Sequence, residues 1–185
     1  MTHQVAVIVG SLRKGSFNRL VAQAIASLSP PELAFTFVEI GDLPLYNQDL
    51  ETDAAPAAWQ RFRKELKAAD AVLFATPEYN RSVSAALKNA IDVGSRPYGQ
   101  SVYDGKPAAV VSVSPGASGG FGANHHLRQS LVFLNMPTLQ QPEAYIGGAG
   151  SLFDEAGKLK NESTAKFLST FASAFASWIN KHSAK

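Results

Sequence analysis

A buried strand, a short polar loop and an amphipathic helix follow one another at the start of this chain. Residues 5–9 (VAVIV) form an unbroken apolar run, which is typical of a parallel strand covered on both faces. The loop at 10–19 then holds two glycines, two serines, an asparagine and three cations. Beyond it, apolar residues recur at helical spacing: Leu20, Val21, Ala24, Ile25 and Leu28. Because backbone N–H groups and a helix N-terminus point into such a loop, this order predicts an anion site within an α/β fold.

The loop matches neither of two widespread phosphate motifs. Gly10 and Gly15 have the separation of a Walker loop, but Ser16 stands where that motif needs its lysine. Leu12 stands where the dinucleotide fingerprint needs its second glycine. Hydroxyl and amide side chains can donate to the several oxygens of a terminal monophosphate, so we expect a ligand of that kind. The alternative is an ordinary strand-to-helix turn in which Ser16 is only the helix N-cap.

Composition indicates one compact domain over residues 1–185. The chain is 45% hydrophobic and 17% charged, and it has no cysteine and a net charge of +2. The lack of cysteine excludes disulfides and thiolate chemistry, and so weak and dispersed a charge gives no argument for nucleic-acid binding. The chain has no apolar run of membrane-spanning length and no signal-peptide pattern. We therefore expect a cytoplasmic protein that binds neither membrane nor nucleic acid.

Strand and helix patterns alternate along the whole chain. After the first unit, strands are expected at 33–40, 71–76, 107–114 and within 136–146, the last broken at 140–142. Helices are expected at 57–69, 82–93, about 122–133 and 162–181. Five strands alternating with five helices predict an α/β fold. The expected architecture is a flavodoxin-like, doubly wound parallel sheet of order 2-1-3-4-5.

Three loops meet at the carboxyl edge of such a sheet. The loop at 10–19 offers phosphate donors, and the loop at 77–81 brings an aromatic ring and an amide. The loop at 115–122 is rich in glycine, so bare backbone can approach a flat ring closely. One phosphate cradle and two walls for a planar heterocycle describe a site for flavin mononucleotide (FMN).

The same three segments carry a resemblance to a known family. Residues 10–19 (GSLRKGSFNR), 77–93 (PEYNRSVSAALKNAIDV) and 114–129 (SPGASGGFGANHHLRQ) resemble the signatures of the NADPH-dependent FMN reductase family. Within it, the bacterial chromate/quinone reductase subgroup is the most similar. The resemblance extends from Val5 to about Ile146, and Val93 departs from it because the family usually has tryptophan there.

This resemblance implies an oxidoreductase with FMN as cofactor and NADPH or NADH as electron donor. Quinones, chromate or similar small molecules would be the acceptors. Hydride would pass from the nicotinamide to flavin N5, so no catalytic side chain is expected and the protein supplies binding and orientation.

Position by position, the resemblance also assigns cofactor-binding residues. The phosphate would be surrounded by Ser11, Arg13, Ser16, Phe17, Asn18 and Arg19. One side of the isoalloxazine ring would be lined by Pro77, Glu78, Tyr79 and Asn80. Its other edge would be closed by Ser114, Gly116, Gly119 and Gly120. Glu78 and Asn80 could instead only cap the following helix.

Two other functions fit parts of the sequence. A non-enzymatic, flavodoxin-type electron carrier would share the fold, but such carriers are commonly acidic and this chain is net positive. Residues 116–120 match the G-x-S-x-G motif of a serine hydrolase, with Ser118 followed by Asp154 and His182 in triad order. Pro115 would disturb the strained turn of that motif, and His182 lies close to the chain end. His125 and His126 point to different sides of a helix, so we expect no metal site.

Apolar residues beyond the third strand predict self-association. The residues concerned are Val83, Leu87, Ala90, Ile91, Val93, Tyr98 and Tyr103. They offer more apolar surface than one face of a sheet needs, and such patches mark association sites. We therefore expect a homodimer or homotetramer whose active site is completed near a subunit boundary; the alternative is that all of them pack in the monomer core.

Overall fold

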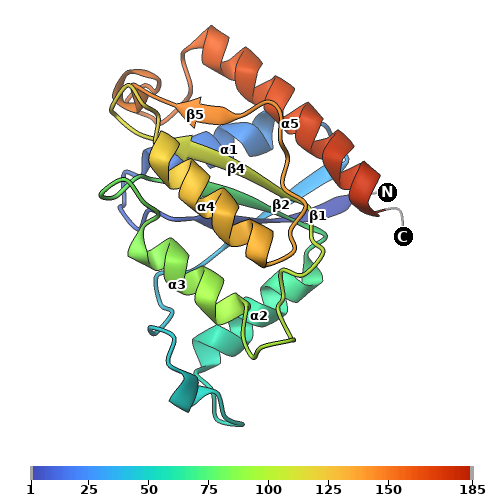
Figure 1. Ribbon diagram of the computed structural model, residues 1–185. Helices are drawn as coiled ribbons and strands as arrows, with labels where there is room; N and C mark the ends of the chain where they lie inside the picture. Colours follow the sequence, from blue (N-terminus) through green and yellow to red (C-terminus); the bar gives the residue numbers. More distant parts are fainter. Residues whose placement is uncertain (1, 184–185) are drawn as a thin grey trace.

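Five parallel strands form one sheet in the computed structural model, which describes residues 2–183 (Figure 1). In chain order they are β1 (His3–Val9), β2 (Leu33–Val38), β3 (Ala71–Thr76), β4 (Ala108–Val113) and β5 (Ala144–Ile146). Their order across the sheet is β2-β1-β3-β4-β5, and each neighbouring pair is parallel. This order confirms the predicted flavodoxin-like fold.

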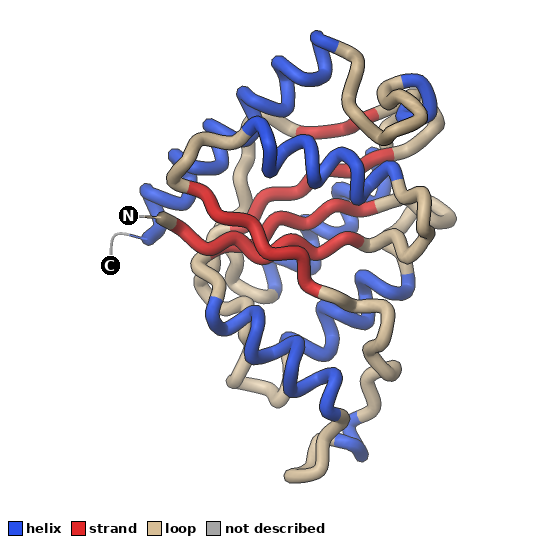
Figure 2. Tube along the Cα trace, turned by 180° about the vertical axis from the view of Figure 1, so that it is seen from behind, coloured by secondary structure: helices blue, strands red, loops and turns tan. Residues whose placement is uncertain are grey.

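Helices cover both faces of the sheet, as Figure 2 shows from behind. One face carries α1 (Phe17–Leu28) and α5 (Glu162–Ser183); the other carries α2 (Ala57–Ala68), α3 (Ala85–Gly94) and α4 (Phe121–Phe133). Two short 3₁₀ turns, η1 (Gln48–Leu50) and η2 (Ala149–Ser151), lie in the loops. No helix within residues 2–183 has the length and hydropathy needed to cross a membrane.

The two faces make two separate cores from alternate residues of the same strands. In β1, Val5, Val7 and Val9 pack with α1 and α5, while Ala6 and Ile8 pack with α2 and α3. A strand that buries both of its faces has no polar alternation. This is why the strands could be recognised from their unbroken apolar runs.

Two elements begin later than the sequence predicts. α3 begins at Ala85 rather than at Ser82, because Tyr79 and Ser82 exchange two backbone hydrogen bonds of 3.0 Å in a tight turn. Ser84 then caps the helix by accepting a hydrogen bond from the Leu87 N–H at 3.3 Å. β5 is confined to Ala144–Ile146, and the segment before it makes only an isolated bridge to β4.

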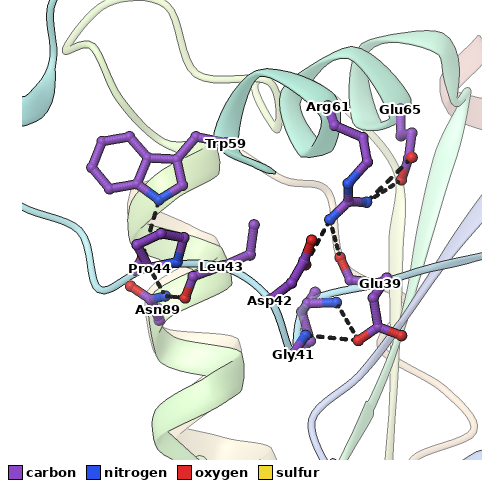
Figure 3. A network of polar contacts seen from close by, with 10 residues as sticks. Glu39, Gly41, Asp42, Leu43, Pro44, Trp59, Arg61, Glu65 and Asn89 are labelled. Carbon is purple, nitrogen blue, oxygen red and sulfur yellow. Dashed lines mark hydrogen bonds and ion pairs between the residues drawn. The ribbon is translucent and has the colours of Figure 1, made fainter. Parts of the chain in front are cut away.

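The segment between β2 and α2 extends away from the sheet but is firmly anchored (Figure 1). The Asn89 side chain of α3 donates to the carbonyls of Leu43 and Pro44, and the indole N–H of Trp59 donates to the same Pro44 carbonyl (Figure 3). Farther along, Arg63 forms a two-pronged ion pair with Glu51, with both distances 2.7 Å. α2 and α3 therefore hold this segment in place.

The expectation that apolar residues around α3 form a surplus surface is wrong for most of these residues. Leu87, Ala90, Val93 and Tyr103 are fully buried, and Ile91 is nearly so, because this group packs into the core on the α2–α3 face. Tyr103 fills the space beneath α3, where a Cβ at Gly94 would lie less than 3 Å from its ring. The departure at Val93 is also accommodated, since its side chain is buried and its carbonyl accepts from Arg63.

Tyr98, one residue of the expected set, is exposed, and so are two apolar residues outside that set. Tyr98 is 82% exposed in the loop after α3, and Val132 and Phe133 are 77% and 72% exposed at the end of α4. Single exposed apolar residues are common on monomers, but adjacent ones mark candidate contact surfaces. The candidate contact surface therefore moves from α3 to the end of α4.

Candidate functional site

The phosphate-type loop begins where β1 leaves the sheet. The Gly10 N–H donates to the Ala75 carbonyl at 2.8 Å, and the Gly10 carbonyl accepts from the Ser84 hydroxyl at 2.6 Å. α1 begins at Phe17, and the Ser16 hydroxyl caps it by accepting from the Arg19 N–H at 3.3 Å. The remaining N–H groups of the first helical turn have no intrahelical acceptor, which makes this end of α1 a favourable place for an anion.

Asn18 is the side chain in this loop that most clearly lacks a partner. It is buried, and its Oδ1 atom has no hydrogen-bond partner among residues 2–183. Buried polar atoms are nearly always paired, so a ligand group is expected here. The amide can accept from a sugar-alcohol hydroxyl or, turned by 180°, donate to a phosphate oxygen. Both groups occur in FMN, so the loop fits this cofactor.

The cations of the loop gather on the side facing β2. Arg13, Lys14 and Arg19 line a cavity of about 340 Å³ together with Ser11 and Glu39. The Arg19 guanidinium lies 5.5 Å from the centre of the Phe37 ring, which holds it near the loop. None of these three cations forms an ion pair within the part of the chain that the structure describes. Their charge is therefore available to an anionic ligand.

The second loop is a tight turn with an unusual backbone. Asn80 and Arg81 have φ angles of +52° and +64°, in the left-handed region that non-glycine residues rarely adopt. Pro77 is buried beneath the turn, while Tyr79 and Asn80 are exposed at its tip. Strained residues of this kind cluster at functional sites.

The third loop lies against β5 through glycines. Gly119 has a φ of +60°, and a Cβ there would lie 2.7 Å from the Tyr145 carbonyl carbon, so a side chain would not fit. Beneath the loop, the buried Asn124 amide donates to the Ser112 hydroxyl and the Ala144 carbonyl. The outer part of the loop, residues 115–118, is exposed. Its backbone is therefore fixed from below and open above.

Three rings lie beside the third loop. Phe121, His125 and Tyr145 have ring centres 4.2 to 6.1 Å apart, and the Tyr145 hydroxyl lies 3.1 Å from His125 Nε2. Burial and the neighbouring Glu143 raise the pKa of Tyr145 to about 12. Tyr145 was not among the site residues expected from the sequence. Its place at the carboxyl end of the fifth strand was the available signal.

The adjacent histidines of α4 have different neighbours. His125 lies beside Tyr145, whereas His126 Nδ1 lies 3.0 Å from the Ser82 hydroxyl. Within residues 2–183, no three His, Asp or Glu side chains are arranged to hold a metal ion.

The serine-hydrolase interpretation fails on geometry. Ser118 lies at the carboxyl edge of the sheet, whereas the end of α5 that carries His182 lies at the amino edge. His3, the first residue of β1, lies 2.7 Å from Asn180 of α5, which fixes that placement. Asp154 accepts from the Lys158 N–H in a local turn. The three side chains cannot act together.

A groove extends from the second loop along two helices. It lies between α3 and α4, has a volume of about 830 Å³ and reaches from Tyr79 and Asn80 to Phe133 and Leu134. Lys88, Asp92 and Arg96 place charges along it. The site is therefore continuous with an open surface on this face of the molecule.

The predicted cofactor residues thus come from the three loops that the sheet brings to one edge. Ser11, Ser16 and Asn18 are buried, whereas Arg13, Tyr79, Asn80 and Gly116 are exposed. Glu78 differs from the others, because its carboxylate turns toward α4 and accepts from the Ala123 N–H at 3.0 Å. Their contacts with a cofactor stay predictions.

Known proteins resemble the chain over nearly its full length. Residues 3–151 match the family described as NADPH-dependent FMN reductase. A quinone reductase of Pseudomonas putida is 67% identical over 177 residues, covering 96% of this chain and 95% of that protein. A 2-hydroxy-1,4-benzoquinone reductase of a Burkholderia species is 46% identical, with 97% of each chain covered. The solved structure of FerB, a flavoenzyme NAD(P)H:(acceptor) oxidoreductase from Paracoccus denitrificans, has a TM-score of 0.92 at 44% identity, covering 98% of this chain and 99% of FerB.

Proposed function

The chain belongs to the NADPH-dependent FMN reductase family, and we propose that quinones are the molecules it reduces. It is an FMN-dependent NAD(P)H oxidoreductase with a flavodoxin-like fold. The proposal for the acceptor rests on one observation: a protein named quinone reductase is 67% identical over almost the whole of both chains. Chromate, as a second acceptor, and a cytoplasmic location stay predictions.

The residues of the three loops would bind and orient the cofactor. Ser16 and Asn18 would hold the phosphate at the N-terminus of α1, and the nearby cations would balance its charge. Bound FMN supplies the chemistry that takes a hydride from the nicotinamide and passes reducing equivalents to the acceptor. The loops at 77–82 and 114–120 would hold the ring between them. The chain therefore contributes position and electrostatics rather than an acid or base.

The exposed tips of the two walls favour a flat molecule as the acceptor. Tyr79 and residues 115–118 are open to solvent, so donor and acceptor could use the same face in turn. A quinone is planar and aromatic, and an exposed tyrosine ring offers it an offset-stacked contact. Such a contact needs no charge on the acceptor.

The electron-carrier alternative makes a different prediction. A carrier needs a separate reductase, whereas this chain should oxidise NAD(P)H with a quinone alone. Purified protein, FMN, NADPH and a soluble benzoquinone are sufficient for the test, with heat-denatured protein as control. Quinone-dependent NADPH oxidation supports the proposal; FMN binding without turnover favours the carrier.

The assembly would be a homodimer or homotetramer whose site is completed near a subunit boundary. Phe133 is exposed and lines the groove between α3 and α4, which reaches the second loop, and it also lines an adjoining pocket with Tyr98. Val132, beside Phe133 on α4, is exposed as well. Light scattering with size exclusion measures the state. Phe133→Glu should shift it toward monomer, whereas Lys166→Glu, on α5 across the sheet, should not. A monomeric wild-type protein with full turnover contradicts this assembly.

A further inference from the structure

A largely buried hydrogen bond joins the two walls of the proposed flavin site. The Glu78 side chain, in the second loop, is only 12% exposed, and its Oε2 atom accepts from the Ala123 N–H of α4 at 3.0 Å. α4 continues directly from the third loop, whose last residue is Gly120. Glu78, in one wall, therefore holds the N-terminus of α4, the helix that directly follows the other wall.

The Glu78 carboxylate caps the N-terminus of α4. The first N–H groups of a helix have no intrahelical acceptor, and a side chain at the N-cap position usually accepts from one of them. The N-cap of α4 is Gly120, which has no side chain to do so. Glu78 supplies the acceptor from another loop, and its negative charge is favourable at that end of the helix.

Glu78 packs closely against the two glycines at the start of α4. A Cβ at Gly122 would lie 2.8 Å from the Arg81 carbonyl oxygen and 3.0 Å from Glu78 Oε2. A Cβ at Gly120 would lie 3.7 Å from Glu78 Cβ. The start of α4 therefore lies directly against the second loop, with glycines at the closest approaches.

Two further links between the walls are weaker. Arg81 lies 3.7 Å from Glu78 Oε1, but its side chain is 83% exposed. His126 lies 3.0 Å from the Ser82 hydroxyl, and this contact is also exposed. Exposed polar pairs contribute little, because water competes for both partners. Of these three contacts, the largely buried one of Glu78 is best able to fix the distance between the walls.

We propose that Glu78 is a positioning residue that fastens the loop at 77–82 to the N-terminus of α4 and so sets the spacing of the two walls that hold the flavin ring. This proposal rests on the proposed function for the identity of the ligand. It requires a side chain of glutamate length with an acceptor atom at its end. A glutamine meets that requirement, whereas an aspartate keeps the charge but is one methylene shorter.

Comparison of shape and charge at this position tests the proposal. Glu78→Gln keeps the acceptor and should weaken FMN binding to the apoprotein by no more than about threefold. Glu78→Asp and Gly122→Ala should each weaken it by about tenfold or more. Quenching of flavin fluorescence measures all affinities, and Glu65→Gln on α2, which makes the same change of charge far from the site, is the control.

Riboflavin, which lacks the phosphate, distinguishes an effect on the ring from an effect on the phosphate loop, and an apoprotein Tm close to that of the wild type distinguishes either from a general loss of structure. If Glu78 sets the spacing around the ring, Glu78→Asp should weaken riboflavin binding and FMN binding by the same factor. Glu78→Gln should bind both flavins almost as tightly as the wild type does. The proposal is overturned if Glu78→Asp binds both flavins like the wild type, if it loses affinity for FMN alone, or if Glu78→Gln is as weak as Glu78→Asp. Wild-type protein that binds no FMN would instead refute the proposed function.

Discussion

Ser16 has two separable tasks, and substitutions can divide them. Its hydroxyl caps α1 through the Arg19 N–H, and it is predicted to donate to the FMN phosphate. Ser16→Asp keeps an excellent N-cap but places a carboxylate beside the phosphate. Ser16→Ala removes both the cap and the donor. We expect apoprotein stability and FMN affinity to change independently in this pair.

The expected magnitudes follow from the two contacts. Loss of an N-cap hydroxyl costs about 1 kcal/mol, which corresponds to about 2–4 °C in Tm for a domain of this size. A hydrogen bond to a charged phosphate contributes about 1.5–3 kcal/mol, so its loss weakens FMN binding by roughly tenfold to a hundredfold. Ser16→Ala should show both effects. Ser16→Asp should keep the apoprotein Tm and bind FMN at least as weakly as Ser16→Ala.

Thermal unfolding of the apoprotein and fluorescence titration with FMN measure the two effects. Asn161→Ala is the matched control, because Asn161 caps α5 through the Thr164 N–H at 2.8 Å and lies outside the predicted site. It should lower the Tm like Ser16→Ala and leave FMN affinity unchanged. If Ser16→Asp binds FMN as tightly as the wild type, the phosphate is not held at this end of α1.

Two further predictions concern stability. Burial raises the pKa of Tyr103 above its ordinary value. Near pH 10 the tyrosine therefore ionises in the unfolded chain but keeps its proton in the folded chain. The contribution of neutral Tyr103 to the free energy of unfolding is complete below about pH 10 and is lost as the pH rises above it. Tyr103→Phe also removes the 2.9 Å hydrogen bond to the Ala90 carbonyl. When the pH is raised from about 8 to about 11, the free energy of unfolding measured in urea should fall less for this variant than for the wild type. An equal fall in both proteins would show that ionisation of Tyr103 does not cause it. Arg81→Gly should stabilise the apoprotein by about 1 kcal/mol or less, because relief of a left-handed φ exceeds the entropy cost of glycine. A clear loss of stability would mean that the Arg81 side chain makes contacts worth more than the backbone strain.

The sheet was predictable because its strands are buried on both faces. The unbroken run at residues 5–9 and the equally apolar 71–76 needed no long-range information. The turn from β1 into α1 was also predictable, since Ser16 follows a buried strand and directly precedes the first residue of the helix; phosphate binding there stays a prediction. Local sequence was sufficient in both places.

Features that depend on contacts between distant segments could not be predicted. Tyr103 was expected at a surface, but a glycine at position 94 leaves room for its ring beneath α3. Glu78 was expected to line the flavin ring, which stays a prediction, or only to cap the following helix α3. Ser84 caps that helix, and the Glu78 carboxylate accepts from α4, forty-five residues along the chain. The turn at Asn80 and Arg81 was also missed as a cause of the late start of α3, because arginine seldom adopts a left-handed φ.

This chain should bind FMN and use it to pass electrons from NAD(P)H to a quinone. Visible absorbance of the purified protein, reconstituted with FMN and freed of excess cofactor, follows both the reduction and the reoxidation of the flavin. Anaerobic NADPH should bleach the bound flavin, and a stoichiometric amount of benzoquinone should restore its absorbance. A protein that retains no FMN, or one whose bound FMN is unchanged by NADPH and NADH, would contradict the account.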